Sequence, residues 1–504
     1  MFNEVHMFLL SFWYHGFMDD KPKPLYTPIV PEVIGQAQPD MLPEEVAPEI
    51  IQPEEVLKTQ SASPPAPPSN TPPPTEHLIR YGVLAGGAIF FILIFALIFR
   101  LILGGKSSGK TVELQYWGLW EEAQVFEPLI AQYQSKHPNV KIVYQKMSSQ
   151  DYREKLLARS KNGQGPDIFR FHNTWLPEIR DVASPIPPSV MSGAEFEKTF
   201  YPVHSKDLKV GSYYYGIPLE IDGLVLIFNN GLFKKAGISK VPISWEEILE
   251  DVPKLSVKTK DGKIITSGLA IGTASNVEHF AEIFGLMLKQ NGGDLRKLDQ
   301  AEAAGTLEAY RKLAEAPSNF WDDTMPNSIP AFVQEKVAMI IAPSWEVLSI
   351  KAQNPDIDLK VAPVPVLPGT SSISLASYWV EGVSKTSKNQ LEAWQFLKFL
   401  SEKETMTKLY ELESKTRLFG EPYSRVDLAG SLASNQYIGV VVAQAKNFTS
   451  MPVVGRTNDN GLNDEIVQNI QNAINATITG VSYSQALVSP KQGIDQVLKR
   501  FNVE

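Results

Sequence analysis

Strand-like and helix-like segments alternate along the chain from residue 111 to the C-terminus. The segment VELQYW, at 112–117, has the composition of a strand, and the apolar residues after it recur on one helical face: Val125, Phe126, Leu129, Ile130 and Tyr133. A second strand is expected at 140–144, then a helix capped by Asp151, then a third strand at 167–171. Three such units predict a mainly parallel sheet, whose ligands lie beyond the carboxyl ends of the strands.

The later segments continue this alternation. The run GIPLEIDGLVLIFNN, at 216–230, places Glu220 and Asp222 ahead of an apolar stretch typical of a strand buried on both faces. Because buried carboxylates are costly unless they are bonded, these two acids need partners. Ser244 begins a helix with the S-x-x-E form of a capping box, and 260–263 reads as a hairpin turn. Further helices are expected at 277–290, 307–313, 391–400, 464–477 and 492–501, and strands at 337–343, 359–366 and 376–384.

The N-terminal region has a different pattern. Residues 82–99 carry no charge, the long side chain of Arg100 can reach the membrane surface, and Leu101 to Leu103 extend the apolar run. This pattern predicts one transmembrane helix at 80–104. The preceding residues 1–79 are rich in proline and glutamate, a composition that predicts a disordered tail.

The charges beside this span do not fix its orientation. Arg80 precedes the uncharged run 82–99, whereas Arg100, Lys106 and Lys110 follow it, which favours a C-terminal domain inside the cell. Long domains cross membranes largely regardless of this bias.

The amino-acid composition of the chain excludes or disfavours several classes of function. The net charge of −9 disfavours a general nucleic-acid binder, which needs a basic face. The absence of cysteine excludes thiolate metal sites, cysteine nucleophiles and a lipid-modified cysteine. No two of the seven histidines lie three or four positions apart, so there is no paired-histidine metal motif, and we expect neither a metal nor a cofactor.

The stretch GGKSSGKT, at 104–111, matches the phosphate-binding P-loop pattern. That motif works when a strand feeds the loop and a helix follows it. Here a membrane helix precedes it and a strand follows, so we interpret 105–110 as a linker.

The order of motifs from about residue 112 resembles the extracellular solute-binding proteins of ABC-type importers, the family that includes maltose-binding protein. Each matching motif is weak alone, but their order is specific. The motifs are YWGLWEE, FEPLIAQYQSKHP, VKIVYQ, GQGPDIFRFHNTWLPEI, YGIPLEIDGLVLIFNNGLFKKAGI, SWEEILE, KVAMIIAPSWE and SYWVEGVSKTSKNQLEAWQFLKFL.

The resemblance implies an α/β fold of the periplasmic-binding-protein type II kind, with two lobes, a hinge and an interlobe cleft. It places 111–221 and 363–414 in the first lobe and 222–362 and 415–504 in the second. The implied crossings lie near 220–223, 363–370 and 412–418. The family also implies a binding domain outside the cytoplasm, a membrane helix in place of a lipid anchor, and an ABC-type permease as partner.

The ends of the strands supply candidate ligand-binding residues. Flat aromatic rings cover the apolar face of a sugar, while carboxylates, amides and arginine bond its hydroxyl groups. For each candidate the alternative is a purely structural role. Two other tryptophans, Trp245 and Trp394, lie in helical patterns and are expected in the core. The candidates are Trp117, Trp120, Glu121, His172, Asn173 and Trp175 in the first lobe; Glu220 and Asp222 at the first crossing; Glu278, His279 and Trp345 in the second lobe; and Tyr378, Trp379, Glu381, Arg456, Asn458 and Asn460 in later segments.

We therefore expect a membrane-anchored receptor that captures a sugar or oligosaccharide for an importer, without catalysis. A carbohydrate hydrolase is the enzyme alternative, because paired acids on tryptophan-rich rims also describe such sites. It would need two acids about 5 Å or about 6.5–9.5 Å apart. The proline-rich tail keeps a third alternative open, a receptor coupled to sensing rather than transport.

Overall fold

The structure is a computed structural model that describes residues 111–367 and 372–503. The expected tail at 1–79 and the expected membrane helix at 80–104 lie outside the described residues. Within those ranges, no helix combines the length and the apolar character needed to cross a bilayer.

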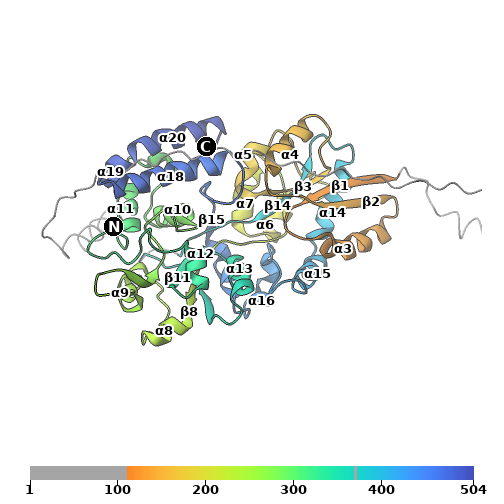
Figure 1. Ribbon diagram of the computed structural model, residues 1–504. Coiled ribbons are helices and arrows are strands. Elements are labelled where there is room, and N and C mark those ends of the chain that lie inside the picture. The colour runs from red at the N-terminus through yellow and green to blue at the C-terminus, as the bar shows by residue number, and fades with distance from the viewer. Residues whose placement is uncertain (1–110, 368–371, 504) are drawn as a thin grey trace, which may run out of the picture. The chain divides into compact units, whose positions relative to one another are not determined.

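The first of two large sheets has six strands, in the order β2-β1-β3-β14-β4, with β7 also paired to β14. Figure 1 labels β1, β2, β3 and β14 in this sheet. Strand β1 runs parallel to β2 and β3, whereas β14 runs antiparallel to β3, β4 and β7. These strands are β1 Val112–Gly118, β2 Val140–Lys146, β3 Ile168–His172, β4 Ala183–Ser184, β7 Ile217–Pro218 and β14 Trp379–Ser384.

Helices cover this sheet through the apolar face that the sequence predicts. The five apolar positions from Val125 to Tyr133 on α3 are all buried, and the Phe126 ring stacks on Tyr144 of β2 with 4.7 Å between centroids. The first-lobe helices are α3 Ala123–Lys136, α4 Tyr152–Lys161, η1 Asn173–Trp175, α5 Leu176–Ile179, α6 Gly193–Thr199, α7 Pro202–Asp207, α14 Gln390–Leu400 and α15 Lys403–Glu413.

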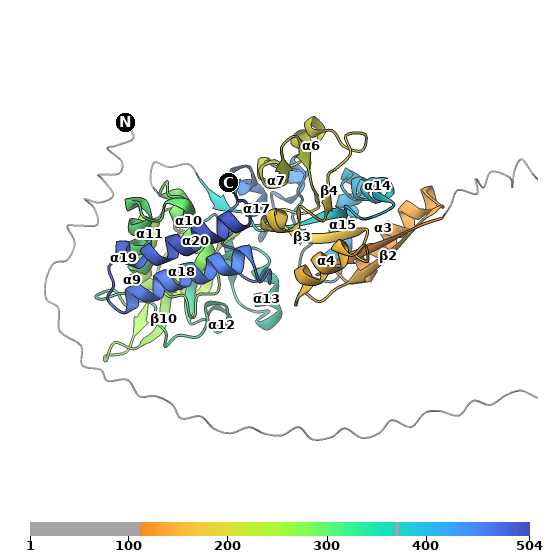
Figure 2. The same cartoon turned by 90° about the horizontal axis from the view of Figure 1, so that it is seen from above.

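The second sheet has the order β12-β8-β11-β10-β9. Strand β8 is almost entirely buried between β12 and β11, as the apolar run after Asp222 predicts. Helices α18 and α20 pack side by side in this second lobe (Figure 2). Its elements are β8 Leu224–Asn229, β9 Val257–Lys258, β10 Ile264–Leu269, β11 Val337–Pro343, β12 Leu359–Ala362, α8 Asn230–Lys235, α9 Trp245–Leu255, α10 Phe280–Gln290, η2 Leu295–Lys297, α11 Ala301–Arg311, α12 Ser328–Val333, α13 Glu346–Gln353, α18 Leu462–Ile478, α19 Tyr483–Ala486 and α20 Val488–Arg500.

Three chain segments run beside one another between the sheets. The Ile221 N–H donates to the Pro422 carbonyl at 2.9 Å, and the Ser377 N–H donates to the Asp222 carbonyl at 2.9 Å. Gly223 is required here, because a Cβ at this position would lie 2.3 Å from the Leu375 carbonyl oxygen. The remaining elements are β5 Lys209–Val210, β6 Tyr213–Tyr214, β13 Ser374–Leu375, β15 Phe448–Thr449, η3 Val426–Leu428, α16 Ala429–Leu432, α17 Gly439–Gln444 and η4 Ala445–Asn447.

Several predictions about local structure are confirmed. Ser244 caps α9 by accepting from the Glu247 N–H at 3.2 Å, and residues 260–263 connect antiparallel β9 and β10. Trp245 and Trp394 are buried.

Other predictions are wrong in part. The first three strands are parallel, but both sheets are mixed, because strands such as β14 enter from the other lobe rather than through a β-α-β crossover. Asp151 precedes α4 without a side-chain capping bond, since its φ of 54° differs from the extended conformation of a capping residue. Strand β12 ends at Ala362, before Pro363 and Pro365, which have no N–H to donate.

Candidate functional site

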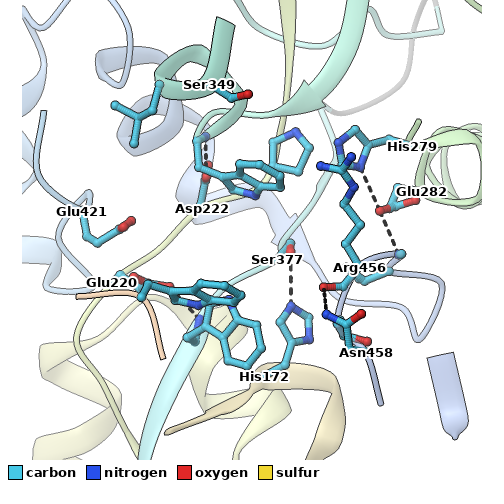
Figure 3. A pocket seen from close by; sticks show the side chains of 18 of the residues that line it. His172, Glu220, Asp222, His279, Glu282, Ser349, Ser377, Glu421, Arg456 and Asn458 are labelled. Atoms are coloured by element: carbon cyan, nitrogen blue, oxygen red, sulfur yellow. Dashed lines mark hydrogen bonds and ion pairs between the residues drawn. The ribbon is translucent and has the colours of Figure 1, made fainter. Parts of the chain in front are cut away.

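A pocket of about 590 Å³ lies between the two sheets, and Figure 3 shows most of the side chains that line it. Both lobes and the crossing segments contribute to its walls. Of the predicted site residues, nine line the pocket: Trp120, His172, Glu220, Asp222, His279, Trp345, Trp379, Arg456 and Asn458.

Trp379 is the centre of an aromatic cluster on the first lobe. It begins β14, directly opposite His172 at the end of β3. The centroid of its ring lies 5.3 Å from Trp120, 5.2 Å from His172 and 5.3 Å from Trp175, all in edge-to-face geometry. Trp175 is fully buried behind the cluster, whereas Trp120 is 40% exposed. The cluster therefore presents an exposed tryptophan surface that packs on a buried one.

Trp345 supplies an aromatic surface from the second lobe. It follows β11, whose residues 337–343 are all buried, and it directly precedes α13. Its ring lies 6.0 Å from that of His279 in edge-to-face geometry. The pocket thus has tryptophan on both lobes.

Asp222 holds the turn that presents Trp345. Its carboxylate accepts from the N–H groups of Gly223 at 2.7 Å, Ser344 at 3.2 Å and Trp345 at 3.1 Å. Burial raises the pKa of Asp222 to about 7, although these backbone bonds oppose the shift. The acid therefore ties the first crossing segment to the second lobe.

Glu220 has the equivalent role for the other tryptophan wall. Its Oε1 accepts from the Trp379 N–H at 2.7 Å. Burial, and then the charge of Glu421, raise the pKa of Glu220 well above its ordinary value. Both acids of the crossing segment thus have the partners that their burial requires.

His172 is held in the neutral form. Its Nδ1 lies 2.8 Å from the Thr174 hydroxyl, and its Nε2 lies 3.2 Å from the Ser377 hydroxyl. Burial lowers the pKa of His172 to about 3.

His279, by contrast, lies between two carboxylates. Its Nδ1 is 3.1 Å from Glu282 Oε1 and its Nε2 is 3.3 Å from Glu346 Oε1. Burial alone would lower the pKa of His279, but the two carboxylates outweigh it and raise the pKa to about 9. Arg456 completes this network by pairing with Glu278 and, at 3.3 Å, with Glu346.

The loop that carries Arg456 has an unusual backbone. Arg456, Asn458 and Asn460 have φ angles of 60°, 53° and 46°. This left-handed region is tolerated by asparagine but is uncommon for arginine. Contacts at both ends hold the loop, since the Gly455 N–H donates to Glu282 at 3.0 Å and the Leu462 N–H donates to Glu178 at 2.9 Å.

The other predicted site residues do not line the pocket. Trp117 packs in the first lobe against Tyr152, and Asn173 and Tyr378 both donate to Asp207, at 2.9 Å and 2.7 Å. Glu121 and Glu381 flank Arg170 in a buried ion-pair cluster. The eight residues in this group are Trp117, Glu121, Asn173, Trp175, Glu278, Tyr378, Glu381 and Asn460.

Sequence reasoning missed ten residues of the lining. Arg417 and Glu421 could have been found, because Glu413, Arg417 and Glu421 follow one another at spacings of four near the expected third crossing. Glu282 follows His279 at helical spacing. No motif or spacing in the sequence marked the others as site residues. The ten residues are Glu282, Pro343, Leu348, Ser349, Ser377, Arg417, Glu421, Val454, Gly455 and Thr457.

Comparisons with known proteins identify the family. The maltotriose-binding protein of Pyrococcus abyssi is 22% identical over 312 residues, which cover 58% of this chain and 63% of that protein. The diacetylchitobiose binding protein DasA of Streptomyces coelicolor is 26% identical over 267 residues, covering 50% of this chain and 60% of that protein. The chain thus spans less than two thirds of the length of these two relatives.

Solved structures share the fold. The sugar-binding protein MalE from Xanthomonas citri matches with a TM-score of 0.64 at 19% identity, over 78% of this chain and 100% of that chain. The family model described as bacterial extracellular solute-binding protein matches residues 117–407. The chain belongs to the bacterial extracellular solute-binding protein family.

Proposed function

We propose that the chain binds a sugar or oligosaccharide in the pocket between its lobes and delivers it to an ABC-type importer. The observation that carries this proposal is the pair of tryptophan walls, Trp120 with Trp379 on one lobe and Trp345 on the other. Each ring can cover the apolar face of a sugar. Relatives named for maltotriose and diacetylchitobiose binding support the same ligand class.

The hydrogen bonds made by Asp222 and Glu220 also favour sugar binding over hydrolysis. The Asp222 carboxylate is occupied by three backbone N–H groups, and Glu220 holds the Trp379 backbone. These acids position the walls of the pocket, so the site needs no covalent step. Closure of the lobes around the sugar would exclude water and strengthen the polar contacts.

Calorimetry against monosaccharides and oligosaccharides, with chromatography of the same samples, tests this function. We expect saturable binding and recovery of the intact sugar. Release of shorter sugars would instead support the hydrolase alternative.

We further propose that the chain is anchored by a membrane helix at 80–104, with the binding domain outside the cytoplasm. The uncharged run at 82–99 and the family support this arrangement. Protease added to intact cells should then cleave the binding domain. Protection in intact cells, with cleavage only after lysis, would contradict the orientation.

A further inference from the structure

Beside one corner of the pocket, carboxyl groups outnumber the cations that can balance their charge. Five glutamates and two arginines form a connected cluster there, which gives an excess of three negative charges if every group is ionised. The members are Glu121, Arg170, Glu220, Glu381, Glu413, Arg417 and Glu421.

The inner part of the cluster is an ion-pair chain. Arg170 donates to Glu121 and to Glu381, each at 2.6 Å, and all three residues are buried. Arg417 continues the chain, with Nη2 3.9 Å from Glu121 and 3.3 Å from Glu413. Each arginine therefore faces at least two carboxylates, and neither has spare charge for another acid.

Glu220 and Glu421 bring this excess to the pocket surface, where both line the wall (Figure 3). Glu220 uses one oxygen to accept from the Trp379 N–H, and Glu421 uses one to pair with Arg417 at 2.8 Å. No hydrogen bond or ion pair joins the second oxygen of either acid to another described residue. Two carboxyl oxygens thus remain for a ligand in the same corner.

The opposite end of the pocket differs in charge. There, protonated His279 and Arg456 face Glu278, Glu282 and Glu346, which leaves an excess of one negative charge. The Glu282 oxygen is further occupied by the Gly455 N–H. The unbalanced charge is therefore concentrated on the Glu220 side.

We propose that the pocket selects a carbohydrate that carries an ammonium group, which binds between Glu220 and Glu421 beside Trp379. This inference rests on the proposed sugar-binding function and specifies its ligand. An ammonium group donates three hydrogen bonds, so it can engage both free carboxyl oxygens. Such charge-assisted bonds are stronger than those of a neutral hydroxyl, and the tryptophan faces add cation–π attraction.

Proton exchange would accompany this binding. In the free protein, burial raises the pKa of Glu220 and Glu381 above their ordinary values and that of Glu413 to about 8. Near neutral pH, protons bound to these carboxyl groups therefore neutralise part of the excess negative charge. A ligand cation replaces them, so binding releases protons.

The test compares β-1,4-linked disaccharides that differ at carbon 2 of each ring, which carries an ammonium group, an acetamido group or a hydroxyl group. We would titrate the full chain at pH 6.5 and low salt with the β-1,4-linked glucosamine disaccharide, its N-acetylated form and cellobiose. The charged disaccharide should bind about tenfold more tightly than cellobiose. Titrations in two buffers of different ionisation enthalpy should detect proton release for the charged sugar alone.

Substitutions of single glutamates test which carboxyl groups cause the preference for the charged disaccharide. Glu421→Gln should reduce the preference to about twofold or less, and Glu220→Gln should act similarly while keeping an acceptor for the Trp379 N–H. Glu278→Gln, at the opposite end of the pocket, is the matched control and should leave the preference unchanged. Circular dichroism checks that each variant is folded.

The outcomes separate this inference from the proposed function. Equal or tighter binding of cellobiose would overturn the inference and leave sugar binding intact. Failure of all three sugars, and of a wider set of neutral sugars, would overturn both. A preference that survives in the folded Glu421→Gln and Glu220→Gln variants would also overturn the inference.

Discussion

Trp120 is the residue whose exposure best separates a role in binding from a role in folding. It lines the pocket and is 40% exposed, whereas its neighbour Trp175 is fully buried. We predict that Trp120→Ala weakens sugar binding about tenfold, because an aromatic contact contributes about 1 kcal/mol beyond its buried area. Calorimetry measures the affinity, and urea denaturation should show little change in stability.

Tyr213→Ala is the matched control for this substitution. Tyr213 is 50% exposed on β6 of the same lobe and does not line the pocket. Its removal should leave the affinity unchanged. Equal losses of affinity in the two variants would show that Trp120 has no specific role in binding.

The raised pKa of His279 predicts that the stability of the fold depends on pH. Its pKa of about 9 in the fold lies above the unfolded value of about 6.5. Protonation therefore stabilises the fold, and this contribution is complete below pH 6.5 and lost as the pH rises to 9. The shift corresponds to about 3 kcal/mol of unfolding free energy.

The His279→Gln variant isolates this effect from that of the other titrating groups. The difference in unfolding free energy between wild type and variant should shrink by about 3 kcal/mol from pH 6.5 to 9. Urea denaturation at several pH values measures it. A difference that stays constant with pH would show that Glu282 and Glu346 do not hold a charged imidazole.

Individual residues of the pocket were predictable where chemistry marked them. Trp345 follows a strand, Trp379 begins one and Asp222 precedes one, and the sequence pattern singled out all three residues. Tyr378 and Asn173 carry similar signals, yet they bind Asp207, an acid that the sequence pattern did not single out. A polar side chain at a strand end can face either the pocket or a buried partner, and only packing decides.

The loop before α18 connects the lobes at the scale of elements. Arg153 of α4 donates to the Asp459 carbonyl at 2.5 Å, and the Asn463 amide donates to Thr174 at 2.8 Å. Burial, and then the charge of Asp459, raise the pKa of Glu178 to about 8. These contacts hold the start of α18 against the first lobe.

Gly461→Ala tests this connection. A Cβ at this position would lie 2.1 Å from Glu178 Oε1 and 2.6 Å from Arg153 Nη2, so these side chains must move. We predict a loss of about 1–3 kcal/mol in unfolding free energy, together with weaker sugar binding, because the adjacent 455–458 line the pocket. Denaturation and calorimetry measure the two effects.

Gly430→Ala is the corresponding control, since a Cβ there has nothing within 4 Å. It should leave both stability and affinity close to wild type. Unchanged properties in Gly461→Ala would mean that the α18 loop does not depend on its contact with the first lobe.

Whole elements were easier to predict than their pairing. Periodicity located helices such as α14 and α18 within two residues. It could not show that β14 inserts beside β3 in antiparallel orientation, because that pairing joins residues about two hundred positions apart. The position of the loop before α18 against α4 depends on the same kind of distant contact.

For the whole molecule, the two sheets and the three neighbouring crossing segments place tryptophan from both lobes in one pocket. The order of motifs along the chain predicted this two-lobe architecture through family resemblance. The geometry of the pocket depends on buried acids, such as Glu220 and Asp222, whose partners the sequence does not reveal. The volume of about 590 Å³ is suited to a small carbohydrate.

The central claim is that this pocket binds a carbohydrate between the two lobes without altering it. The most direct test is calorimetry of the full chain against a panel of sugars, with chromatography of each sample and Trp345→Ala and Trp379→Ala as variants. We predict saturable binding of one sugar per chain, recovery of that sugar intact, and affinity reduced at least tenfold in both variants. Release of shorter sugars, or binding unaffected by the loss of either tryptophan, would contradict the claim.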